Sequence, residues 1–445
     1  MTPLIRKTIT RLFLITTAVV GAYLLLVTVV RLLPAPADQR EAVALLKEPI
    51  APVRGRNATH ALWLQKHDVP VALQERVGKA LLDYYRADPA RGQAPIGPGH
   101  PLASYPLLQD TPYDGPGLCE QLKPGCLAFV RGNLAHVQDT LATRQRGLAN
   151  ALALHNFDGM RYGLDSAELT SPIQPFSAHR RLVNTHFAAL FATGQKTEAL
   201  SGLCDDIAAW RRLGADNDSV IGSMIAVGTV RRDVFLLGEM LAELPAEESL
   251  PAECTKALAD STDAEFDMCP AMKSEFAFAR SQMDGKWDAH MNTWQRAISR
   301  VFMHQRDHEG RTAINLSAFC GEQVVARMRE DQPTRTWPDK AQGQCGTFAS
   351  IVSPYSCMLT SISHSTGYAP YVDRRTDQAA ILALARTVVW LRQREADTTR
   401  WPAVLKQRPA SLGLRREPSI SADGRSVSIP LWSQPGEDTF TWPLR

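Results

Sequence analysis

The chain has 445 residues, of which 44% are hydrophobic and 21% are charged, a balance typical of globular proteins. This composition excludes a disordered, charge-dominated chain, and the length suffices for two or three domains or one extended helical array. Lys and Arg number 49 against 46 Asp and Glu, with no basic block, so charge gives no support to nucleic-acid binding. Arginine far outnumbers lysine, as is typical of GC-rich bacterial genomes.

The first predicted element is a membrane-spanning helix over residues 12–33. Residues 12–30 carry no charge, and at about 1.5 Å per residue this run nearly crosses the roughly 30 Å hydrocarbon layer of a bilayer. Leu32 and Leu33 extend the run if the Arg31 side chain reaches up to the interface. We therefore expect a retained signal-anchor.

Basic residues before the apolar run predict the topology. Arg6, Lys7 and Arg11 precede it, so residues 1–11 are expected to stay in the cytoplasm as a short tail. The long C-terminal part is then periplasmic, and the protein is a single-pass protein of the bacterial inner membrane. The lipid bilayer is its first predicted partner.

A cleaved signal peptide is the alternative, with cleavage after Ala37 at the small residues of Ala35-Pro36-Ala37. The apolar core is longer than the usual 7 to 15 residues of a signal peptide. Arg31 also separates that core from the cleavage site, and Pro34 and Pro36 crowd it. These features favour the anchor.

All the cysteines lie beyond the predicted anchor, and their number, eight, is even. In an oxidising compartment this predicts up to four disulfides, although inert buried thiols are the alternative. The pairs Cys119 with Cys126 and Cys345 with Cys357 need the shortest loops, and no C-x-x-C motif indicates zinc or redox chemistry. The other candidates are Cys204, Cys254, Cys269 and Cys320.

After the anchor, prolines mixed with charges predict a stalk over residues 34–60, with a short helix near residues 41–46. A helical domain is expected over residues 61–400, beginning with an amphipathic helix at 70–85. A long loop rich in proline and glycine follows at 88–117 and is typical of a lid, a binding loop or an ordered wrap.

Apolar residues at helical spacing dominate the rest of this domain. Turn residues such as Gly194 and Gly214 separate segments of similar length, so we expect antiparallel helical hairpins. The predicted helices cover residues 126–156, 178–193, 197–213, 217–244, 250–262, 264–305, 311–331, 347–363 and 376–395.

The last segment, residues 401–445, differs from the helical domain. A helix start at 401–405 is followed by alternating apolar residues at 427, 429 and 431, which predict a strand. A second run at 439–442 is expected to pair with that strand as a hairpin. The expected fold class is therefore mainly α, with one transmembrane helix and a small C-terminal β element.

Few side chains suggest chemistry. His304 and His308 are four residues apart on a helix predicted to end near residue 309, a spacing that suits a shared metal, but no third ligand is identifiable. The charged residues at 205–206 and 211–212 are typical of a solvated helix face, and those at 373–377 of capping and solvation before a helix. No cofactor-binding pattern occurs, and we expect no cofactor.

These patterns predict a non-enzymatic envelope protein whose helical array binds another envelope protein. No G-x-S-x-G elbow, P-loop or G-x-G-x-x-G motif occurs in the sequence. One alternative is a periplasm-facing hydrolase, metal-dependent through His304 and His308, with the 88–117 loop as a lid. A second alternative is an anchored inhibitor or immunity protein that neutralises a toxin.

Overall fold

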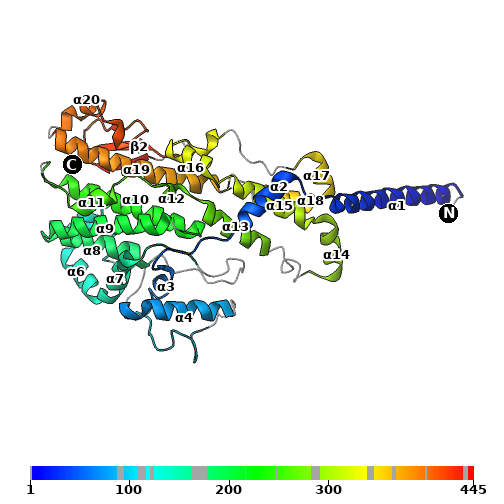
Figure 1. Cartoon of the computed structure of the whole chain (residues 1–445), viewed down its shortest axis with the longest axis horizontal. Coiled ribbons are helices and arrows are strands. Elements are labelled where there is room, and N and C mark those ends of the chain that lie inside the picture. Colours follow the sequence, from blue (N-terminus) through cyan, green and yellow to red (C-terminus); the bar gives the residue numbers. More distant parts are fainter. Residues whose placement is uncertain are drawn as a thin grey trace. The chain divides into compact units, whose positions relative to one another are not determined.

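The computed structural model describes residues 3–87, 95–108, 117–120, 125–162, 178–215, 217–246, 248–281, 291–337, 345–362, 367–395, 398–433 and 439–444. Over these residues the chain is mostly helical, with a small antiparallel sheet near its C-terminal end (Figure 1). It divides into two compact units. Unit 1 comprises Met1–Glu48, Phe276–Ala318 and Asp339–Gly367, and unit 2 comprises Pro49–Glu275, Phe319–Pro338 and Tyr368–Arg445.

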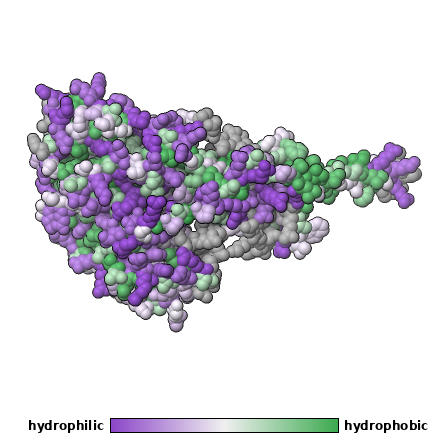
Figure 2. Space-filling model, in the orientation of Figure 1, coloured by the Kyte–Doolittle hydropathy of each residue, from purple (hydrophilic) through white to green (hydrophobic). Residues whose placement is uncertain are grey.

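Unit 1 begins with α1 (Pro3–Leu32), the one helix of the described residues that is long and apolar enough to cross a membrane. Its surface is apolar over most of its length (Figure 2). The hydroxyls of Thr10, Thr17 and Thr28 each donate to the carbonyl four residues earlier. Such back-bonding satisfies polar groups inside an apolar helix, so these threonines leave α1 compatible with a lipid environment.

The rest of unit 1 is a small group of helices. α2 packs on α15, where Gly310 lies directly against the Gln39 side chain and leaves no room for a Cβ. Lys47 at the end of α2 forms an ion pair with Glu309, with 2.7 Å between Nζ and Oε1. The bounds are α2 (Ala37–Lys47), α14 (Thr293–Phe302), α15 (Gln305–Ser317), α17 (Thr347–Val352) and α18 (Pro354–Ile362).

Unit 2 contains most of the other helices, and α13 (Cys269–Ser281) contributes residues to both units. The α-helices of unit 2 are α3 (Thr59–Leu62), α4 (Gln74–Ala87), α5 (Cys126–Gly132), α6 (Leu134–Thr143), α7 (Gln145–Leu152), α8 (Ala178–Ala192), α9 (Lys196–Ala215), α10 (Val220–Ala242), α11 (Ala252–Ala257), α12 (Asp263–Phe266), α16 (Glu322–Arg329), α19 (Ala369–Arg394) and α20 (Trp401–Leu405). Short 3₁₀ turns are η1 (Val71–Leu73), η3 (Ala153–Asn156), η5 (Thr334–Thr336), η7 (Thr398–Arg400) and η8 (Ala410–Leu412).

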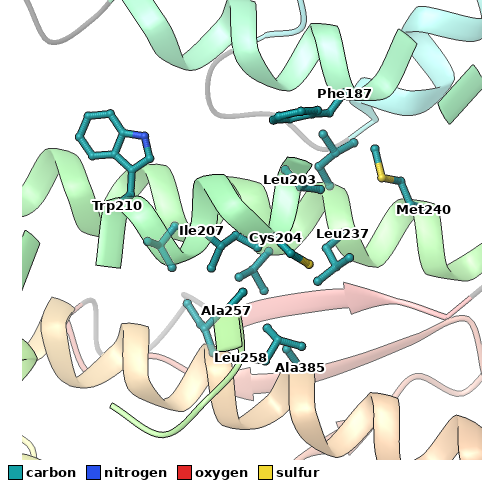
Figure 3. Close-up of a cluster of buried hydrophobic side chains, with 14 of the residues drawn as sticks. Phe187, Leu203, Cys204, Ile207, Trp210, Leu237, Met240, Ala257, Leu258 and Ala385 are labelled. Carbon is teal, nitrogen blue, oxygen red and sulfur yellow. The ribbon is translucent and has the colours of Figure 1, made fainter. Parts of the chain in front are cut away.

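The main core of unit 2 forms where α8, α9, α10 and α19 pack together. Leu203 and Ile207 of α9 meet Leu237 and Met240 of α10, and all four side chains are fully buried (Figure 3). Phe187 of α8 lies over the same cluster. Burial of side chains of this size stabilises a fold by about 1.5–3 kcal/mol each, so this cluster organises the unit.

The sheet has the strand order β1-β2-β3, with β1 (Ser419–Ile420), β2 (Ser426–Pro430) and β3 (Thr439–Pro443) all antiparallel to their neighbours. Val427 pairs with Trp442 and Ile429 with Phe440, and these four side chains are buried in the core of unit 2. The predicted hairpin is confirmed. The structure adds the short strand β1, which the sequence pattern did not predict.

Several predicted helices are interrupted. The single helix expected over 126–156 is divided into α5, α6, α7 and η3, because Asn133 and Arg144 adopt non-helical backbone angles, with φ of −132° and −112°. The helix expected over 264–305 is likewise wrong, since α12 and α13 are separate and α14 begins only at Thr293. The apolar period continues across the breaks because consecutive short helices bury the same side.

Other boundaries also moved. The segments expected at 311–331 and 347–363 each consist of two helices, and α19 begins at Ala369, well before the expected residue 376. Of the loop expected at 88–117, residues 88–94 and 109–116 lie outside the described residues. The described part packs within unit 2, where Leu102 and Tyr85 are buried in one apolar cluster and an antiparallel bridge joins His67 to Leu107.

Candidate binding pocket in unit 2

A pocket of about 680 Å³ opens in unit 2. Helices α10 and α19 supply two of its walls, and the strand β3 and the disulfide between Cys119 and Cys126 supply the others. Its apolar lining residues include Met224, Val227, Phe235, Leu236, Ile381 and Phe440, and its cationic ones are Arg181, Arg231, Arg232 and Arg374. The pocket therefore combines a hydrophobic surface with several guanidinium groups.

Helix α10 presents its lining residues because they recur every three or four positions along one side. The helix begins at Ser219, whose Oγ accepts a hydrogen bond from the Gly222 amide at 3.2 Å and caps the first turn. Farther along, Gly238 packs against the Trp442 ring, where a Cβ would come within 3.0 Å of the indole. This close approach fixes β3 beside α10 and places Phe440 in the pocket lining.

Two of the four arginines, Arg231 and Arg374, form no ion pair with a carboxylate of the described residues. The guanidinium of Arg231 lies 5.9 Å from the Phe440 ring centroid, and that of Arg374 lies 5.6 Å from the Tyr371 ring centroid. Stacking on an aromatic face leaves the N–H donors at the edge of the guanidinium directed outward. Both groups are therefore able to donate hydrogen bonds to an anion in the pocket.

The pocket has three acidic lining residues, Glu120, Glu239 and Asp377, and the last two are engaged by the groups described next. Glu239 accepts hydrogen bonds from the amides of Gly125 and Leu127 at the start of α5, the latter at 2.9 Å. Asp377 is paired with the buried Arg416, with 2.6 Å between Oδ1 and Nη1. These contacts compensate Glu239 and Asp377, and the four arginines outnumber the three acidic lining residues, so the pocket lining carries a net positive charge.

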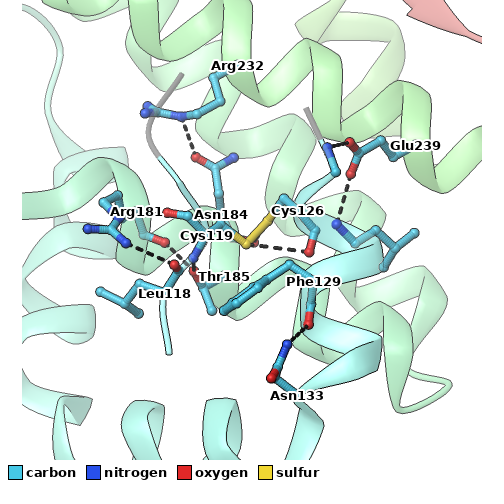
Figure 4. Close-up of a disulfide and its surroundings, with 12 residues drawn as sticks. Leu118, Cys119, Cys126, Phe129, Asn133, Arg181, Asn184, Thr185, Arg232 and Glu239 are labelled. Carbon is cyan, nitrogen blue, oxygen red and sulfur yellow. Dashed lines mark hydrogen bonds between the residues drawn. A yellow bond between two sulfur atoms is a disulfide. The ribbon is translucent and has the colours of Figure 1, made fainter. Parts of the chain in front are cut away.

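The other two arginines are held by hydrogen bonds (Figure 4). Arg181 donates to the carbonyls of Leu118 and Cys119, at 3.0 and 2.7 Å. Arg232 donates from Nε to Oδ1 of Asn184 at 2.8 Å. These hydrogen bonds hold the guanidinium groups of Arg181 and Arg232 in fixed orientations on the pocket rim, beside the disulfide.

A buried polar chain lies behind this rim. Asn184 donates to Asp233 at 2.8 Å, and Nε2 of His155 lies 2.6 Å from Oδ1 of Asp206. Burial, followed by the charge of nearby Asp206, raises the pKa of Asp233 well above its ordinary value. Asp233 accepts this hydrogen bond from the Asn184 amide, and Oδ1 of Asn184 in turn orients Arg232.

All eight cysteines are paired. The four disulfides join Cys119 to Cys126, Cys204 to Cys254, Cys269 to Cys320, and Cys345 to Cys357. The two short-loop pairs are those that the spacing favours. Four disulfides fit an oxidising compartment.

No protein-family model, no curated protein and no solved structure matches this chain. The function must therefore be inferred from the geometry of its own residues.

The structure does not place His304 and His308 as the sequence suggested. α14 ends at Phe302 and α15 begins at Gln305, so His304 is the N-cap residue of α15 and His308 lies in its first turns. Burial lowers the pKa of both imidazoles, and Nδ1 of His308 lies 3.4 Å from the Thr360 hydroxyl. Across the described ranges, no group of three His, Cys, Asp or Glu side chains gathers to hold a metal.

Several of the charged groups interpreted as solvated are instead buried, although Asp205 is exposed as expected. Asp206 is 2% exposed, and Arg211 is 7% exposed and forms an ion pair with Glu265 at 2.7 Å. Arg375 is also buried and donates to the carbonyl of Gly214. An interpretation from helical periodicity assumes that charged side chains face the solvent. These groups are buried because their partners come from distant segments of the chain.

The pocket residues gave no signal in the sequence. They come from segments separated by up to about three hundred residues, and no local motif joins Arg231 to Arg374. The adjacent Arg231-Arg232 pair in an otherwise apolar helix was the one available hint, because such a helix has no reason of its own to carry two cations.

Proposed function

We propose that this protein is a single-pass, membrane-anchored protein of the bacterial envelope whose helical domain faces the periplasm and binds an anionic group of a partner protein. Its helices would be arranged as a set of antiparallel hairpins. The observation that carries the proposal is the pocket of unit 2, where Arg231 and Arg374 lie beside an apolar surface. Guanidinium groups next to aromatic rings suit a carboxylate on a hydrophobic peptide segment.

Two features support the location. α1 is long and apolar enough to cross a membrane, and Arg6, Lys7 and Arg11 near its start favour a cytoplasmic N-terminus. The four disulfides lie beyond α1 and suit the oxidising periplasm. In this topology the arginine-lined pocket is accessible to other envelope proteins.

The test is capture of partners from cells that express the tagged full-length chain, after mild crosslinking. A partner should be recovered with the wild type and lost by at least tenfold with the double variant Arg231→Gln and Arg374→Gln, because a hydrogen bond to a charged group contributes about 1.5–3 kcal/mol. Arg329→Gln is the matched control, since Arg329 pairs with Asp263 on the exposed surface of unit 2. Equal recovery with the pocket variant would refute the proposal.

The two alternatives predict different results. An anchored inhibitor or immunity protein predicts that the captured protein is a toxin. A hydrolase that uses His304 and His308 predicts stoichiometric metal in the purified chain, and a loss of both metal and activity in His304→Ala.

A further inference from the structure

Helix α14 in unit 1 has its apolar side on the outside. Trp294 is 77% exposed and Ile298, one turn later, is 43% exposed. On the inner side Ser299 is buried, and Arg296 is half-buried and donates to the carbonyl of Met291. A helix that packs on a protein in water would bury its apolar side and expose its polar side. α14 does the opposite, so its outer side suits an apolar environment.

Two further helices of unit 1 also expose large apolar side chains, and of these α18 packs against both α14 and α17. Phe348 and Ile351 of α17 are 57% and 51% exposed, and Met358 of α18 is 53% exposed. Together with Trp294 and Ile298 they form what we call the collar, five large apolar side chains on three short helices of unit 1. Clusters of exposed apolar side chains of this size mark an interaction surface.

The collar is joined directly to α1. The Tyr23 ring lies 6.1 Å from the Phe302 ring of α14, and the Tyr23 hydroxyl donates to the Ile351 carbonyl of α17 at 3.0 Å. Val27, one turn farther along α1, is buried at 3% exposure. Figure 2 shows apolar surface running from α1 onto the adjoining part of unit 1.

Arg31 marks the end of this contact. Its Nη2 donates to the carbonyls of Val301 and Met303, at 2.6 and 3.2 Å, at the C-terminus of α14. A helix C-terminus is a favourable position for a cation, so Arg31 is bound by unit 1 where we had expected it to reach the interface by itself. From Tyr23 to Arg31 the contact follows α1 for about 12 Å.

We infer that the collar is inserted into the outer leaflet of the bilayer beside α1. The inference rests on the proposed anchoring of α1, since 12 Å from the outer end of a membrane-spanning helix is within the lipid. Trp294 on a short amphipathic helix is typical of an interfacial segment, whose apolar side is buried about 5–10 Å into the boundary of headgroups and acyl chains. Lipid thus covers the exposed side chains, and a second copy of the chain is the competing occupant.

Quenching of tryptophan fluorescence by brominated lipids tests this in vesicles that contain the full-length chain. α1 has no tryptophan, so the signal of Trp294 is the difference between the wild type and Trp294→Phe. We expect this difference signal to fall by more than half, and more with bromine at shallow than at deep acyl positions. Trp390→Phe in α19 of unit 2 is the matched control, and its difference signal should stay unquenched.

The outcomes are distinguishable. Extraction of the chain by alkaline carbonate would refute the anchoring of α1, and with it the proposed topology. Retention of the chain with an unquenched Trp294 signal would overturn the collar alone. Quenching that appears only when the chain is diluted to one copy per vesicle would also overturn it, because a second copy then covers the collar. Retention with quenching at every dilution supports the inference.

Discussion

The buried guanidinium of Arg416 joins the C-terminal segment to the helices of unit 2. It is 3% exposed and forms a bidentate pair with Asp331, at 2.9 and 2.7 Å, and a further pair with Asp377 at 2.6 Å. It also lies over the Trp432 ring at 4.3 Å and donates to the Pro430 carbonyl at the end of β2. Arg416→Met would keep much of the side-chain volume and remove every one of these donors.

The expected loss of stability is large because the carboxylates of both Asp331 and Asp377 remain in the variant. The side chains of Asp331 and Asp377 are only 12% and 5% exposed, so each would remain buried and uncompensated by Arg416. Breaking one side of a buried ion pair typically lowers the free energy of unfolding by roughly 3–5 kcal/mol. We expect Arg416→Met to fall in this range, measured by urea unfolding of the solubilised full-length chain with tryptophan fluorescence as the signal.

Two further variants make the test decisive. Arg329→Met removes an ion pair whose side chains are 53% and 67% exposed, and it should change stability by about 1 kcal/mol or less. Adding Asp331→Asn and Asp377→Asn to Arg416→Met should recover part of the loss, because no unpaired charge then remains buried. A loss below 1 kcal/mol for Arg416→Met, or no recovery in the combined variant, would refute this reasoning.

Three other changes have expected outcomes. Asp233→Asn should raise the free energy of unfolding at pH 7, because burial raises the pKa of this carboxyl and opposes its ionisation only in the folded chain. Cys204→Ala with Cys254→Ala should cost about 4 kcal/mol, since this disulfide closes a loop with a sequence separation of 50. Gly202→Ala should cost about 1–3 kcal/mol in thermal unfolding, because the new methyl would overlap the Phe187 ring.

Each of these has its own control. The gain from Asp233→Asn should disappear near pH 3, where the carboxyl is protonated in both states, and persistence there would contradict the assignment. Removing the Cys119–Cys126 disulfide, with a separation of only 7, should cost less, about 2.5 kcal/mol. A Cβ at Gly132 would have no atom within 4 Å, so Gly132→Ala should not destabilise the chain. An equal loss of stability at Gly132 and Gly202 would indicate a backbone effect and contradict the overlap with the Phe187 ring.

The sequence predicted the elements that depend on local pattern. The long helices α8, α9 and α10 begin and end within about three residues of the predicted bounds, since apolar period and terminal glycines both depend on neighbouring residues. The pairing of β2 with β3 followed from alternation in the same way. Breaks at Asn133 and Arg144 were missed because neither residue is a strong breaker and the apolar period passes through them.

What the sequence could not show depends on distant contacts. Arg211 was interpreted as solvated because Glu265, its partner, lies 54 residues farther along the chain and beyond two further helices. The pocket has the same origin, since Arg231 and Arg374 line one pocket only when α10 packs on α19. Even the apolar run of α1 gave no indication that Arg31 would be bound by α14.

The composition of unit 1 from three separate chain segments sets the order in which it can form. α1 and α2 are synthesised first, and their partners α14 and α15 follow only after Pro49–Glu275 has been made. At about 5–20 residues per second this interval lasts roughly 10–45 s. During that time Tyr23 and Arg31 have none of their native contacts with α14 or α17. In a nascent chain, α1 would therefore lack its packing partners for this time. The growing chain could then bind a chaperone or associate prematurely with other copies.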